Sequence, residues 1–104
     1  MKIVLFRDGR PGVVAQLPGE DPIGELAKLL GGETEMTEIN TRLRLVTVKN
    51  SEKLPVRYAA HGLEEEPKQI AGDCAVVAVR PEGVFRDVTT LEFTAAKACI
   101  QLLG

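Results

Sequence analysis

The chain has 104 residues, with 13 Lys and Arg against 15 Asp and Glu, which gives a formal net charge of −2. It is 44% hydrophobic and 27% charged. These values are typical of one globular domain, and they exclude a disordered chain, a fibrous repeat and a membrane protein. The even charge and the four aromatic residues disfavour binding to nucleic acid without excluding it. The longest apolar run, residues 74–79, is too short to span a membrane, and the start does not fit a signal peptide, so we expect a cytoplasmic protein.

The first third of the chain predicts a hairpin and a helix. Residues 2–6 and 13–17 are strand candidates that flank an Asp8-Gly9 turn. Asp21 can cap a helix that starts at Pro22, and Gly31 can end it in the left-handed conformation. The helix should be two to three turns long, and it needs a sheet to dock on because isolated helices of this length are marginal.

Residues 33–39 and 42–48 predict a second hairpin around Asn40-Thr41. With that two-residue turn, Leu43 and Leu45 share a face with Met36. Arg42, Arg44 and Glu35 then share the opposite, charged face.

Residues 49–72 are the least regular part, and residues 54–60 read as a short extended segment or a turn of helix. Residues 70–79 predict a buried central strand entered through a Gly-Asp turn, and residues 84–88 a short return strand. Thr89 and Glu92 fit a capping box ahead of a final helix over 91–103.

That last helix is apolar over a wider stripe than one sheet face needs. Either it is deeply wrapped or part of it meets a second subunit. The dimer interpretation assigns Phe93, Ile100 and Leu103 to the interface.

These elements predict an α+β fold for a single domain, residues 1–104. It has a mainly antiparallel sheet in the order ββαββ-loop-ββα, with two helices packed on it.

The residue types needed for chemistry are scarce. Cys74 and Cys99 belong to no metal-binding pair and read as reduced thiols that act as small hydrophobes. A zinc site needs about four ligands; two Cys and one His are too few, so we expect no metal and no cofactor. No catalytic residues can be assigned.

The candidate binding residues are mainly basic. Arg42, Arg44 and Arg57, with Arg7 and Arg10, would form an anion-attracting patch if the two hairpins were neighbours; otherwise they are ordinary strand and turn charges. Tyr58 and His61, beside Arg57, mark an alternative small-molecule or enzymatic site around residues 54–62.

Several short motifs occur in a characteristic order along nearly the whole chain. They are Leu29 to Gly32, Glu33 to Met36, Leu45 to Glu52, Leu54-Pro55, Ile70 to Asp73, and Gly83 to Leu91. In order and spacing they resemble a bacterial and phage family known only as a domain of unknown function, number thirty-eight forty-six. That family often has Asn-Arg after the Leu-Pro, where this chain has Val56-Arg57. The resemblance implies no established activity; it suggests an accessory protein linked to a phage or mobile element.

Three functions follow as expectations. The first is a non-enzymatic binding or regulatory module that acts through contacts with a partner protein or a second copy. The second is a nucleic-acid-associated factor that uses the arginine face. The third is a small-molecule binder or enzyme with its site around residues 54–62.

Overall fold

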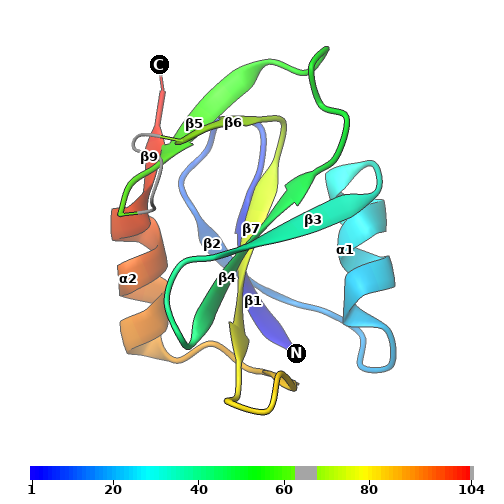
Figure 1. The fold of residues 1–104 in the computed structure, drawn as a ribbon, viewed down its shortest axis with the longest axis vertical. Helices are drawn as coiled ribbons and strands as arrows, with labels where there is room; N and C mark the ends of the chain where they lie inside the picture. The colour runs from blue at the N-terminus through cyan, green and yellow to red at the C-terminus, as the bar shows by residue number, and fades with distance from the viewer. Residues whose placement is uncertain (63–67, 104) are drawn as a thin grey trace.

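The structure, a computed structural model, describes residues 1–62 and 68–103. Within these ranges the chain forms two antiparallel sheets, of six and three strands, and two helices, which confirms the α+β fold (Figure 1). The elements, in chain order, are β1 (Lys2–Phe6), β2 (Val13–Gln16), α1 (Pro22–Leu30), β3 (Thr34–Glu38), β4 (Leu43–Val48), β5 (Val56–Ala60), β6 (Lys68–Ala71), β7 (Cys74–Val79), β8 (Phe85–Arg86), α2 (Thr90–Cys99) and β9 (Ile100–Leu102).

The large sheet has the order β2-β1-β7-β4-β3, and β8 pairs with the end of β7. All six residues of β7 are buried, because β1 and β4 flank it and both of its faces are covered. The continuous apolar run at 74–79 therefore forms the central strand, as its sequence predicts.

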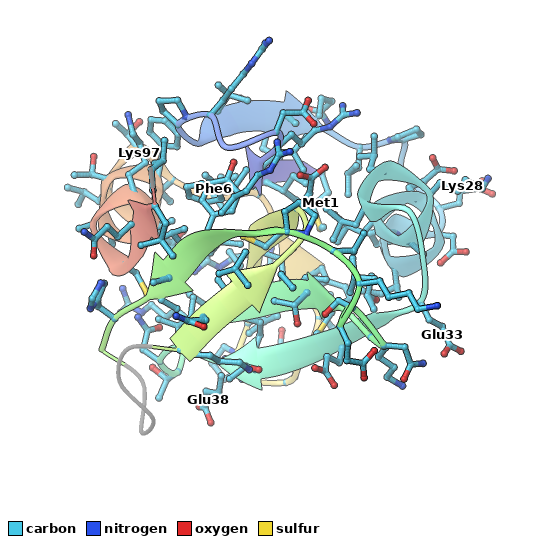
Figure 2. All side chains as sticks on the ribbon, turned by 90° about the horizontal axis from the view of Figure 1, so that it is seen from above. Met1, Phe6, Lys28, Glu33, Glu38 and Lys97 are labelled. Atoms are coloured by element: carbon cyan, nitrogen blue, oxygen red, sulfur yellow. The ribbon has the colours of Figure 1, made fainter. Side chains whose placement is uncertain are left out.

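Two hydrophobic clusters cover the two faces of this sheet. On one face α1 supplies Leu26 and Leu30, which pack on Ile3, Leu5 and their neighbours. On the other face lie the small sheet, of order β6-β5-β9, and α2. Seen from above, α1 and α2 stand at opposite sides of the molecule with the sheets between them (Figure 2).

Helix α1 begins and ends where its sequence predicts. The Asp21 side chain accepts a hydrogen bond from the Gly24 N–H at 3.1 Å, and Pro22 stands in the first turn. Gly31 closes the helix at φ 88°, where a side chain would be strained.

Helix α2 starts with the predicted capping box of Thr89 and Glu92, but its expected end is wrong. It stops at Cys99, and Ile100–Leu102 form β9, which pairs with β5. Ile100 is 2% exposed. Burial of this β-branched residue by a distant strand overrides the local helical pattern.

The β3–β4 hairpin has a longer turn than predicted. Met36 pairs with Val46 and Glu38 with Arg44, so the register is shifted by one residue. A one-residue shift moves every side chain to the other face. Met36 therefore shares a face with Arg44, whereas Glu35 lies on the face of Leu43, opposite to the prediction.

The region expected to be irregular contains two strands, β5 and β6, with residues 63–67 between them outside the described part. The strand expected over residues 70–79 is divided at Gly72, which has φ +79°, so that β6 and β7 lie in different sheets. Neither described helix is long and apolar enough to cross a membrane.

Candidate functional site

A pocket of ≈ 510 Å³ lies at the end of the large sheet where β7 finishes. It is lined by Thr41, Arg42, Val79, Arg80, Pro81 and Arg86. We call it the arginine pocket. Among these lining residues there is no carboxylate, imidazole or thiol, so they offer charge and hydrogen-bond donors but no general base at neutral pH.

Strand pairing brings the arginines together. β4 and β7 run antiparallel with Leu43 opposite Ala78, so the residue before β4 and the residues after β7 meet at one end of the sheet. The Val79 N–H donates to the Arg42 carbonyl at 2.8 Å and extends the ladder by one step. Arg86 reaches the pocket from β8, which pairs with the last two residues of β7.

Two turns hold the pocket walls. The Asn40 Oδ1 accepts hydrogen bonds from the N–H groups of Arg42 at 2.8 Å and Leu43 at 3.0 Å, which fixes the backbone on both sides of Thr41. On the other wall the Gly83 N–H donates to the Arg80 carbonyl at 2.8 Å. The backbone that carries Arg42 and Arg80 is thus set before any ligand arrives.

The three arginines differ in electrostatic state. Arg86 donates to both carboxylate oxygens of Glu92, at 2.7 and 2.6 Å, and these bonds hold the pKa of Glu92 down to about 2. Arg86 is therefore neutralised by its partner. Arg42 and Arg80 are exposed, and no described residue forms an ion pair with either side chain. The pocket lining therefore keeps two positive charges that no described carboxylate neutralises.

The structure does not gather the predicted arginine set. Of Arg42, Arg44 and Arg57, only Arg42 lines the pocket. The Arg44 Nη1 donates to the carbonyls of Asn40 at 2.7 Å and Leu43 at 3.1 Å, so this side chain is bonded to the turn between β3 and β4. Arg57 lies on β5 beside Gly9, at the opposite end of the large sheet.

Sequence reasoning missed Arg80 and Arg86. Each stands next to a short turn, where a charged residue is ordinary. One sequence feature could have found Arg80: Arg42 directly precedes the strand 43–48, and Arg80 directly follows the strand 74–79. If these strands pair antiparallel, the two arginines lie side by side. Nothing in the sequence alone selects that pairing over others.

Tyr58 and His61, proposed for a site around residues 54–62, make contacts that hold the fold together. Tyr58 is fully buried; its hydroxyl donates to the Arg10 carbonyl at 2.9 Å, and its ring meets Phe6 edge-on at 5.7 Å. Burial raises the pKa of Tyr58. The His61 Nε2 lies 2.6 Å from the Gln101 Oε1, and the His61 N–H donates to the Cys99 carbonyl at 2.8 Å.

The three residues assigned to a dimer interface do not form one surface. Ile100 is buried in the core of the chain itself, so it is not accessible to a second copy. Phe93 is half-buried against the same core, and Leu103 is 39% exposed. The most exposed apolar residue of α2 is Leu91, at 83%.

Cys74 and Cys99 form no disulfide in the described part of the chain, and the Cys99 thiol donates to the His61 carbonyl at 3.0 Å. Cys74 is buried in the core, and desolvation raises the pKa of its thiol to about 12, which keeps it protonated and unreactive. In the described part of the chain, no three His, Cys, Asp or Glu side chains converge as ligands for a metal ion.

No family model matches the chain, and neither the curated proteins nor the solved structures contain a significant match. The resemblance to the family of unknown function therefore stays a prediction, and the arginine pocket is interpreted from its own geometry.

Proposed function

We propose that the protein is a non-enzymatic binding module whose arginine pocket receives a carboxylate from an acidic segment of a partner protein. The observation that carries this proposal is that two arginines without an acidic partner among the described residues line one preformed pocket. Guanidinium groups bind carboxylates with paired, charge-assisted hydrogen bonds.

The chemistry of the walls supports a peptide rather than a bare ion. Val79 and Pro81 line the pocket together with Arg42 and Arg80 and give it an apolar part. A side chain with a methylene stem and a carboxylate end, such as Glu, would place its stem on these residues and its charge on the guanidinium groups. Thr41 also lines the pocket, and a threonine hydroxyl is a neutral hydrogen-bond donor.

The charge and the rings of the chain disfavour the nucleic-acid alternative. The net charge is −2, whereas binding along a phosphate backbone needs many cations on one surface. Phe6 and Tyr58 are buried, and Phe85 and Phe93 are half-buried against the two cores. None of the four rings is presented as a stacking platform for single-stranded bases.

The test is a titration of the ¹⁵N-labelled protein with a short oligoglutamate peptide, followed by NMR. We expect shifts at the amides of Arg42, Val79 and Arg80, and weak affinity because the ion pairs are solvent-exposed. Replacing Arg42→Glu together with Arg80→Glu should weaken binding by about tenfold or more.

A charge-matched control sits at the other end of the sheet. Arg7→Glu with Arg57→Glu makes the same change in net charge away from the pocket and should leave binding within about twofold. Equal losses in both double variants would reduce the effect to net charge and contradict the proposal. Stronger binding of random single-stranded or duplex DNA than of the peptide would favour the nucleic-acid alternative instead.

A further inference from the structure

The two outer edges of the large sheet are protected very differently. β3 carries Glu35 and Glu38 and follows Glu33, and its Thr37 hydroxyl accepts a hydrogen bond from Lys68 at 3.1 Å. Charges of this kind keep an edge strand from pairing with another chain. At the opposite edge, residues 11–19 around β2 contain no charged residue at all. Figure 2 shows the two strands at opposite borders, with Glu33 and Glu38 labelled on the β3 side.

The hydrogen-bond pattern shows which groups of β2 face outward. Met1 and Leu17 exchange both main-chain bonds, at 3.0 and 2.8 Å. In an antiparallel pair such residues alternate with residues that point away from the partner strand. In the β1–β2 register, Val13 and Ala15 therefore bond to β1. The N–H and C=O groups of Val14 and Gln16 point to the open edge.

The side chains at this edge are exposed and apolar. Val13 is 56% and Val14 49% exposed. Among the described strands β2 pairs with β1 alone, so it offers unpaired main-chain groups and uncovered apolar surface together. β9, at the edge of the small sheet, is a poorer template because it has three residues and its Ile100 N–H already donates to the Ala96 carbonyl.

We propose that β2 pairs with β2 of a second copy of the chain, antiparallel about a two-fold axis at Ala15. In that register Val14 faces Gln16 of the second copy and Gln16 faces its Val14, which gives four main-chain hydrogen bonds. Pro18, which has no N–H, lies beyond these pairs. The large sheet then continues from one copy into the other.

Charge complementarity favours a second copy as the occupant. The uncharged segment 11–19 is bounded by Arg10 on one side and Glu20 on the other, and both are exposed. An antiparallel two-fold about Ala15 brings Arg10 of each copy toward Glu20 of the other. Pairing of two β3 edges would instead bring the acidic residues Glu35 and Glu38 of one copy close to those of the other. The inference is independent of the arginine pocket, which lies at the end of β7.

The test is sedimentation velocity over a concentration series with paired charge variants. Val14 and Gln16 are exposed, so substitutions there are compatible with folding, which circular dichroism checks. The double variant Val14→Glu, Gln16→Glu places like charges at both cross-strand pairs and should raise the dimer dissociation constant by about tenfold or more. The variant Val14→Lys, Gln16→Glu places opposite charges at the same pairs and should restore the dimer.

Two results would overturn the proposal. One is a wild-type chain that stays monomeric at every concentration up to about 1 mM. The other is a dimer that survives Val14→Glu, Gln16→Glu but is lost on Leu91→Glu, which would place the interface on α2. Hydrogen exchange on the wild-type chain needs no substitution: the Val14 and Gln16 amides should gain protection as the concentration rises, and unchanged exchange through dimerisation would also refute the edge pairing.

Discussion

The two faces of the large sheet are covered in different ways. On one face a single helix, α1, docks beside strands that are its close neighbours in the sequence. The other face is covered by three short strands and α2, from residues 56–60, 68–71 and 90–102 (Figure 1). The core that they close contains Phe6 and Tyr58, the two largest fully buried side chains. Both cores rest on the same long-range sheet, but the helix that covers the first face follows a local pattern, whereas the elements that cover the second face meet only through strand pairing. Tyr58, the largest fully buried side chain, belongs to the second core, so its loss should cost more than the loss of Leu26 on the first face.

Tyr58→Ala should have the largest effect on the free energy of unfolding and so tests this difference most strongly. The side chain is fully buried, packs edge-on against Phe6 and donates to the Arg10 carbonyl, so its removal leaves a cavity and an unpaired carbonyl. We expect the free energy of unfolding to fall by about 3–5 kcal/mol, measured by urea denaturation. Tyr58→Phe keeps the ring and should cost only about 1 kcal/mol. A loss below about 1 kcal/mol for Tyr58→Ala would contradict the central place of this residue.

The matching change on the α1 face is Leu26→Ala. Leu26 is fully buried at the middle of the helix stripe, and we expect a loss of about 2–4 kcal/mol in the same urea assay. Leu91→Ala, at a position 83% exposed on α2, is the control and should stay within about 0.5 kcal/mol of wild type. A loss for Leu26→Ala larger than that for Tyr58→Ala would reverse the comparison between the two faces.

The sequence predicts the α1 face well and the other face poorly, for a physical reason. The start and end of α1 are set by residues at its own two ends: Asp21 and Pro22 begin the helix, and Gly31 ends it. The end of α2 is not: residues 100–102 read as helix until β5 is known to lie beside them. The register of β3 and β4 was missed because the Asn40 side chain extends the turn by bonding two backbone N–H groups.

The candidate site was predictable only in part. Arg42 could be singled out as a basic residue at a strand end, but Arg80 joins it only through the pairing of β4 with β7. In the sequence Tyr58 and His61 are candidates because they lie in a stretch without a clear pattern, and such stretches often carry function. The stretch instead contains β5, which places the Tyr58 ring in a core.

The ion pair between Arg86 on β8 and Glu92 on α2 should make the free energy of unfolding depend on pH in the acid range. Arg86 and the Thr89 cap hold the pKa of Glu92 at about 2, below its usual value of 4.5. A carboxylate with a lowered pKa stabilises the fold above its unfolded-state pKa, and this contribution is lost as the pH falls from about 5 toward 2. Glu92→Gln should therefore cost about 2 kcal/mol at pH 7 and nearly nothing near pH 2. Denaturant midpoints at several pH values measure this, and a cost that does not change with pH would refute the ion pair's contribution.

Substitution of Arg42 and Arg80 in the arginine pocket should have the smallest effect on stability. A loss of binding in such a variant can then be assigned to the pocket, because the fold is unchanged. Arg42 and Arg80 are exposed and contribute to neither core, whereas Arg86 joins β8 to Glu92. Arg42→Ala with Arg80→Ala should leave the free energy of unfolding within about 0.5 kcal/mol of wild type, while Arg86→Ala should cost about 1–2 kcal/mol. Thermal denaturation of the three variants separates these cases. The Arg42 and Arg80 substitutions could instead destabilise the fold as much as Arg86→Ala does. The two side chains would then make structural contacts of their own, and their charges would not be available to a partner's carboxylate.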